Sequence, residues 1–139
     1  MFILDTNIIS ELRKSRLGKT DPGLLDWIRS VPESAQFLSV ITLFELEYGV
    51  LLMEARDPEQ GKRLRTWLEK QVRPAFEGRV LVVDEAVVRQ GAKLRIGHPR
   101  PYRDSFIAAT ALVHGMTVVT RNLADFEPLG VPVFNPFSG

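Results

Sequence analysis

The chain has 139 residues, of which 45% are hydrophobic and 25% are charged, and its formal net charge is +1. This composition is typical of one globular domain, and the nearly neutral charge neither requires nor excludes a nucleic-acid partner. The absence of cysteine excludes disulfides and thiolate metal sites. Because no apolar run reaches membrane-spanning length and no leader pattern is present, we expect a cytoplasmic protein with no membrane partner.

Short apolar runs predict strands that are buried on both faces of a sheet. We expect these strands at residues 2–4, 37–41, 79–83, 116–120 and 131–134. Helical patterns separate the runs, and we expect helices at residues 7–13, 21–31, 42–55, 57–76, 84–96 and 104–115, with a turn or short helix at 122–126. Strands that alternate with helices indicate a single α/β domain over residues 1–139, with a parallel sheet covered on both faces.

Acidic side chains follow the predicted strands. Asp5 comes directly after the first strand, Glu45 follows the second, and Asp125 follows the strand at 116–120. Asp104 begins the helix that leads into that last strand. If these strands are neighbours, their carboxyl ends bring three or four carboxylates together. Like charges repel unless a cation lies among them, and Mg²⁺ and Mn²⁺ prefer such oxygen ligands, so the pattern indicates a metal site for phosphate chemistry.

Each of these carboxylates also has a local interpretation. Asp5 suits a helix N-cap, and Thr42 with Glu45 has the spacing of a capping box. Asp104 would interact favourably with a helix dipole, and Asp125 suits a turn. The residues alone leave both interpretations open, because a helix N-terminus can serve as a cap and as a site.

Four segments resemble, in order, the four acidic motifs of the PIN-domain nucleases. They are LDTNIISEL at 4–12, ITLFELEYGV at 41–50, RDSFIAATAL at 103–112 and VVTRNLADF at 118–126. The chain is most similar to VapC-type toxins of bacterial toxin–antitoxin pairs, in the FitB-like branch, which shares the ending VFNP at 133–136. The resemblance implies a three-layer α/β/α fold with a central, mostly parallel sheet, and RNA cleavage that depends on Mg²⁺ or Mn²⁺.

The resemblance also implies roles for single residues. Asp5 and Asp104 match aspartates that bind the metal, and Glu45 matches the glutamate of the second motif. Asn122 stands where many relatives have an aspartate, so Asp125 is the candidate for the fourth acidic position, and the number of metal ions stays open. The predicted catalytic and metal-binding set is therefore Asp5, Glu45, Asp104 and Asp125, supported by Thr6, Thr120 and Asn122.

Basic and apolar residues suggest the partners. Arg100, Arg103 and Arg121 flank the acidic motifs and are predicted to bind the RNA backbone, followed by Lys14 and Arg16. The resemblance implies a homodimer and a cognate antitoxin that occupies a groove beside the carboxylates. Apolar side chains on the helices at 21–31 and 42–76 would supply that surface, including Leu46, Tyr48, Leu51, Leu52, Trp67 and Leu68.

Two other functions remain open from the sequence. One is a catalytically silent PIN-like binding module, whose carboxylates only cap helices. The other is an aspartate-based phosphoryl-transfer enzyme with Asp5 as the nucleophile. Such an enzyme would need a second aspartate two residues further on, where this chain has Asn7.

Overall fold

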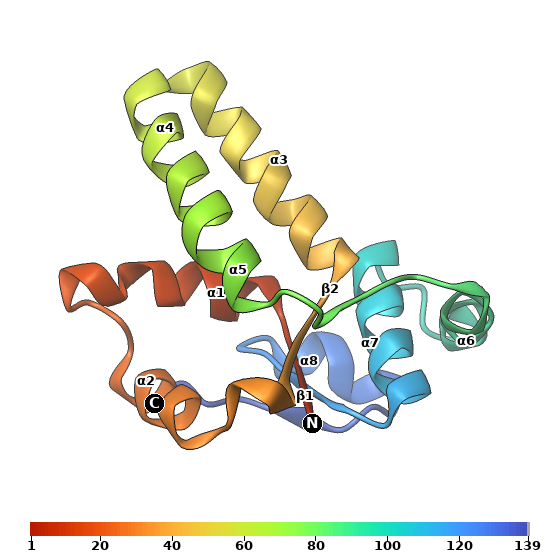
Figure 1. Cartoon of the computed structure of the whole chain (residues 1–139). Coiled ribbons are helices and arrows are strands. Elements are labelled where there is room, and N and C mark those ends of the chain that lie inside the picture. Colours follow the sequence, from red (N-terminus) through yellow and green to blue (C-terminus); the bar gives the residue numbers. More distant parts are fainter. Residues whose placement is uncertain (139) are drawn as a thin grey trace.

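The central sheet has five parallel strands in the order β3-β2-β1-β4-β5 (Figure 1). The computed structural model describes residues 1–138, with the exception of the side chain of Arg16. The strands are β1 (Phe2–Leu4), β2 (Gln36–Ser39), β3 (Val80–Leu81), β4 (Thr117–Val119) and β5 (Val133–Phe134). All five predicted strands are present, and those after β1 are shorter than the apolar runs that predicted them.

The helices follow the predicted periodic segments closely. They are α1 (Thr6–Leu12), α2 (Pro22–Ser30), α3 (Val40–Arg56), α4 (Pro58–Trp67), α5 (Arg73–Ala75), α6 (Glu85–Arg95), α7 (Tyr102–His114) and α8 (Leu123–Phe126). A π-helical turn joins α4 to α5, so the predicted helix at 57–76 is almost continuous. Within residues 1–138, no helix combines the length and the hydropathy that crossing a membrane requires.

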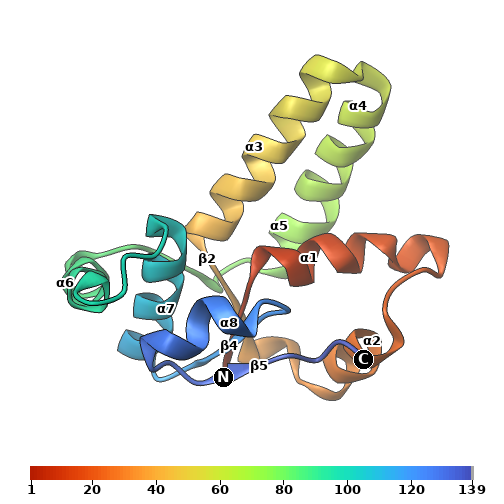
Figure 2. The same cartoon turned by 180° about the vertical axis from the view of Figure 1, so that it is seen from behind.

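Alternate strand residues face two separate cores. Leu4, Leu38 and Val119 pack in a core with α1 to α4 on one face of the sheet. On the other face, the strand residues Ile3 and Val118 pack against α7 and α8. Because side chains alternate along a strand, strands β1 to β4 each contribute side chains to both cores. The result is the expected three-layer α/β/α fold, with α6 and α7 lying side by side (Figures 1 and 2).

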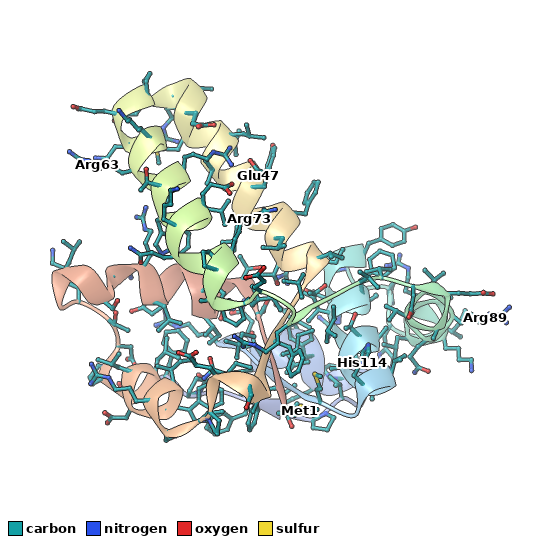
Figure 3. The ribbon with its side chains drawn as sticks, viewed as in Figure 1. Met1, Glu47, Arg63, Arg73, Arg89 and His114 are labelled. Carbon is teal, nitrogen blue, oxygen red and sulfur yellow. The ribbon has the colours of Figure 1, made fainter. Side chains whose placement is uncertain are left out.

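Helices α3 and α4 form a hairpin that extends away from the sheet (Figures 1 and 2). Gly61 of α4 lies so close to α3 that a Cβ atom there would collide with the backbone of Glu54. Arg65 of α4 pairs with Glu47, at 2.6 Å, and with Glu54, at 3.3 Å. Figure 3 shows Glu47 on the hairpin, where glycine and arginine together fix the close packing of its two helices.

The six apolar residues expected on this surface differ in exposure, and Trp67 is partly buried against the core beside α1 to α4. Leu46 and Leu68 are buried in the core, so their predicted exposure is wrong, because both pack inward against the sheet. Tyr48, Leu51 and Leu52 are each more than half exposed along α3. The helix therefore keeps a smaller apolar surface than the sequence suggested.

Candidate active site

The carboxyl ends of three neighbouring strands form the candidate active site. Strand β1 lies between β2 and β4, so the residues that follow these strands meet at one edge of the sheet. Asp5 follows β1 and Thr120 follows β4, while α3 leads away from β2 with Glu45 on its second turn. Asp104 reaches the same place from the first turn of α7.

Asp5 is buried, and both of its carboxylate oxygens accept hydrogen bonds. Its Oδ1 atom accepts a hydrogen bond of 2.8 Å from the backbone N–H of Thr6, and its Oδ2 atom accepts one of 2.8 Å from the Thr120 hydroxyl. Asn7 donates through Nδ2 to Asp5, at 3.3 Å, and to Thr120, at 3.2 Å. Asp5 is thus the N-cap of α1, as its local interpretation predicted, but capping uses only one of its contacts. Asn7 is a supporting residue that the sequence analysis did not assign.

Glu45 does not belong to a capping box. Helix α3 begins before Thr42, and its N-cap is Ser39, whose Oγ atom accepts a hydrogen bond of 3.0 Å from the backbone N–H of Ile41. The serine at the end of the second strand was the available signal for this cap. Glu45 instead faces the site, where its Oε1 atom accepts a hydrogen bond of 2.5 Å from the Thr6 hydroxyl.

Arg103 brings the three carboxylates together. Its Nη2 atom lies 2.6 Å from Asp5 Oδ1, its Nε atom 2.7 Å from Glu45 Oε2, and its Nη1 atom 2.6 Å from Asp104 Oδ1. A fourth hydrogen bond, of 2.8 Å, runs from Nη2 to Glu45 Oε1. The sequence analysis proposed Arg103 for RNA binding, whereas the structure places its guanidinium group among the carboxylates.

This arrangement shifts the pKa values of Glu45, Asp104 and Arg103. Burial raises the pKa of Glu45, but hydrogen bonds from Arg103 and Thr6 outweigh it, so the pKa lies below its usual value. Burial also raises the pKa of Asp104, and there the opposing hydrogen bond from Arg103 is too weak to reverse the shift. Burial disfavours the charge of Arg103, yet its bonds to Glu45 and Asp5 raise its pKa. Glu45 is therefore held ionised, while Asp104 takes up a proton more readily than a free aspartate.

Asp125 lies at the edge of this cluster. Its half-exposed carboxylate is 3.9 Å from Arg100, and it acts on Asp104 only as a nearby negative charge that raises the pKa of that group. The backbone N–H of Asn122 donates a hydrogen bond of 3.0 Å to the Thr120 hydroxyl. Asn122 therefore supports the site through its backbone, and Asp125 is the negative side chain beside it.

The other predicted RNA-binding residues surround the site. The guanidinium of Arg121 lies over the ring of Phe137, at 4.5 Å, and its backbone N–H donates to Asn7. Lys14 pairs with Glu11 at 3.0 Å. The side chain of Arg16 lies outside the described part of the structure. Arg100, through Asp125, and Arg121, through Asn7, are thus each in contact with a residue at the edge of the site.

The donor atoms of the cluster suit a hard divalent cation. Asp5, Glu45 and Asp104 offer only carboxylate oxygens, which Mg²⁺ and Mn²⁺ prefer. In the arrangement described, these oxygens bind the guanidinium of Arg103, and within residues 1–138 no group of three or more histidine, aspartate or glutamate side chains is placed to hold a metal ion. The carboxylate oxygens are therefore the type of ligand that such an ion prefers, but in this structure they bind the guanidinium of Arg103.

A cavity of about 360 Å³ opens beside the cluster, between α1 and the α3–α4 hairpin. Its lining is mostly apolar at the hairpin and polar next to the site. The lining residues are Thr6, Ser10, Arg13, Lys14, Glu45, Leu46, Gly49, Val50, Met53, Leu64 and Trp67. Thr6 and Glu45 belong to both the cavity and the acidic cluster, so a molecule in this groove would reach the carboxylates.

The protein is thus a small three-layer α/β/α protein with a parallel sheet. Its acidic site lies at the carboxyl ends of the central strands. Residues 2–127 match the PIN domain family, and the chain belongs to this family. It is 39% identical to the VapC ribonuclease Y4jK of Sinorhizobium fredii, over 99% of this chain and 98% of that protein. It is 35% identical to toxin FitB of Neisseria gonorrhoeae, over 99% of each chain.

Solved structures agree with these similarities. The crystal structure of FitAcB from Neisseria gonorrhoeae matches with a TM-score of 0.87 at 35% identity, over 98% of each chain. A structure of FitAB bound to a DNA fragment matches with a TM-score of 0.88 at 34% identity, over 100% of this chain and 97% of that one. The resemblance to PIN-domain proteins of the VapC and FitB type is thereby confirmed.

Proposed function

We propose that this protein is the toxic endoribonuclease of a toxin–antitoxin pair and hydrolyses RNA phosphodiester bonds with the help of Mg²⁺ or Mn²⁺. The observation that carries the proposal is the convergence of Asp5, Glu45 and Asp104 at one edge of the sheet in a chain of the PIN domain family. Relatives named VapC ribonuclease and toxin FitB, similar over nearly their full length, support the same activity.

The carboxylates would hold the metal ion. Asp5, Glu45 and Asp104 are its candidate ligands, and Asp125 would add negative charge from the edge of the site. When bound, such an ion supplies a Lewis acid that activates water and neutralises charge on the phosphate. The hydroxyl of Thr120 fixes the orientation of Asp5, and that of Thr6 fixes Glu45.

Glu45 is the candidate for accepting a proton from the attacking water. Its hydrogen bonds keep its pKa below the usual value, so it is ionised at neutral pH. Thr6 holds the Oε1 atom, which directs the carboxylate toward the site. A fixed and ionised carboxylate within reach of the water is what general-base catalysis requires.

Arginines would position the RNA. Arg100 and Arg121 lie next to Asp125 and Asn7, at the edge of the cluster. Contacts between arginine and phosphate bind nucleic acid without reading its sequence, and they weaken as salt increases. We therefore expect RNA binding to depend strongly on ionic strength.

The antitoxin would occupy the groove beside the carboxylates. This cavity is apolar along the hairpin and ends at Thr6 and Glu45, so one partner segment could bury apolar side chains and cover the acidic residues. A homodimer is expected as well, and the exposed side chains of Phe44, Tyr48 and Leu51 on α3 are suited to it.

Cleavage and growth assays test the proposal together. The purified protein should cleave RNA with Mn²⁺ or Mg²⁺ and should stop when a chelator removes the ion. Expression of the chain alone should arrest growth, and co-expression of the small protein encoded beside it should restore growth. A soluble protein that accumulates without any effect on growth would show that the toxin assignment is wrong.

One observation favours a catalytically silent binding module instead. Arg103 already neutralises the carboxylate cluster, as a purely structural ion-pair network would. Calorimetry with Mn²⁺ separates the two functions, because a silent module would bind no ion at Asp5. A phosphoryl-transfer enzyme would accumulate a phosphorylated Asp5, and the asparagine at position 7 argues against it.

A further inference from the structure

We propose that Arg103 is an internal counter-ion that competes with a divalent metal ion for Asp5, Glu45 and Asp104. A metal ion then binds to these carboxylates only when the guanidinium leaves them. This inference rests on the proposed metal-dependent function and adds a regulatory element to the same site.

The first argument is that every nitrogen of the Arg103 guanidinium contacts a carboxylate. Arginine has one Nε and two Nη atoms, and in Arg103 each of the three lies within 2.7 Å of a carboxylate oxygen. The three carboxylates come from three different elements: Asp5 follows β1, Glu45 lies on α3 and Asp104 lies on α7. Since an arginine keeps its charge in proteins, the cluster has a permanent cation while this contact lasts.

The second argument is that a metal ion would need the same oxygens. Arg103 binds Asp5 Oδ1 at 2.6 Å, while Asp5 Oδ2 accepts a hydrogen bond of 2.8 Å from Thr120. Both oxygens of Glu45 contact the guanidinium as well. Guanidinium and metal would also repel each other as like charges at short range. The two cations therefore exclude one another.

The third argument is that Arg103 can leave without a change of fold. It lies in the first turn of α7, and its side chain is 29% exposed. Outside the carboxylates, its only other hydrogen bond within the described residues is a long one, 3.5 Å, to Thr6. Rotation of the flexible side chain toward solvent would open the cluster while α7 stays in place. Metal affinity is then set by the cost of breaking these ion pairs.

Calorimetric titration with Mn²⁺ in the absence of RNA tests the inference. We expect the dissociation constant to be at least about tenfold lower in Arg103→Met than in the parent protein. Mn²⁺ should also raise the Tm of Arg103→Met more than that of the parent, because it replaces the missing cation. Adding Asp5→Asn to Arg103→Met should remove this binding, which assigns it to the cluster.

The chain offers a matched control in Arg65. This arginine pairs with three glutamates of the hairpin, Glu47, Glu54 and Glu69, and its side chain is 28% exposed. Arg65→Met therefore removes the same charge and the same number of ion-pair partners at a different place. We expect it to leave the Asp5-dependent Mn²⁺ affinity unchanged.

The possible results separate this inference from the proposed function. If parent and Arg103→Met bind Mn²⁺ equally, or the variant binds it more weakly, the counter-ion role is refuted while metal-dependent function stands. If neither protein binds Mn²⁺ at Asp5, both proposals fail. Should Arg103→Met not fold, Arg103→Lys retains the charge but places it on a single nitrogen, which does not reproduce the separate contacts of Nε, Nη1 and Nη2. An unchanged dissociation constant in that variant would also overturn the inference.

Discussion

Replacing Asp5 by asparagine should abolish RNA cleavage while the protein stays folded. The substitution keeps the size of the side chain and one oxygen, which can still accept from the N–H of Thr6 and from Arg103. The Thr120 hydroxyl already accepts from Asn7 and from the N–H of Asn122, so the new amide group can donate to it only if the Asn7 side chain turns away. What the site loses is the negative charge of Asp5.

The size of the stability loss can be bounded. Losing a hydrogen bond to a charged group costs about 1.5–3 kcal/mol, and Arg103 retains Glu45 and Asp104 as partners, so we expect about 1–2 kcal/mol. Even a domain with only about 5 kcal/mol of stability would then stay more than about 99% folded. Unfolding therefore cannot account for a large loss of activity. If Asp5 holds the proposed metal ion, its loss should reduce cleavage by at least about 100-fold.

Cleavage of a labelled RNA with Mn²⁺, measured beside a thermal melt, decides the matter. Asp26→Asn is the control, since Asp26 is an exposed residue of α2 that undergoes the same chemical change. The control should cleave like the parent. If Asp5→Asn cleaves within about threefold of the parent, while its melt shows a folded protein, Asp5 is not a metal ligand and the site has been misassigned.

Three further results are expected. Gly61→Ala should destabilise the protein by about 1–3 kcal/mol in urea unfolding, because the added Cβ atom would collide with α3. Gly49 has open space around it, so Gly49→Ala should leave stability unchanged or raise it by up to about 1 kcal/mol. Burial opposes ionisation of Glu45, but its hydrogen bonds lower its pKa below the usual 4.5. Ionised Glu45 thus contributes stability above about pH 4.5, and this stability is lost as the pH falls through the lower pKa of the folded state. The free energy of unfolding, measured in urea above and below this pH, should therefore fall less for Glu45→Gln than for the parent. Asp125→Asn should raise the Mn²⁺ concentration for half-maximal cleavage only several-fold, because Asp125 makes no contact with Arg103 among the ion pairs of residues 1–138, and an unchanged midpoint would remove it from the site.

Local patterns in the sequence determined the elements of this fold. Apolar runs bounded by helical periods located all five strands, and aspartate before proline at positions 21–22 and 57–58 marked the starts of α2 and α4. Gly115 ends α7 with a positive φ of 67°, which glycine adopts without strain. These signals act over a few residues, so they can be read without knowing the rest of the structure.

The four acidic segments also identified the candidate residues before any contact was known. Asp5, Glu45 and Asp104 are separated by dozens of residues, and only the strand order places them together. The adjacency of β1, β2 and β4 follows from the packing of both cores, which involves side chains from the whole chain. The sequence therefore predicted convergence of these carboxylates only on the condition that the strands are neighbours.

Only the tertiary structure decided the partner of these carboxylates. In the sequence, Arg103 is one of several arginines beside an acidic motif, with nothing to distinguish it from Arg100 or Arg121. In the structure its guanidinium contacts Asp5, which lies 98 positions away in the chain. Likewise Ser39, rather than Thr42, caps α3, which frees Glu45 for the site. Residue types and spacing fix what a side chain can bind, but the choice among possible partners depends on which distant elements the folded core brings within hydrogen-bond distance.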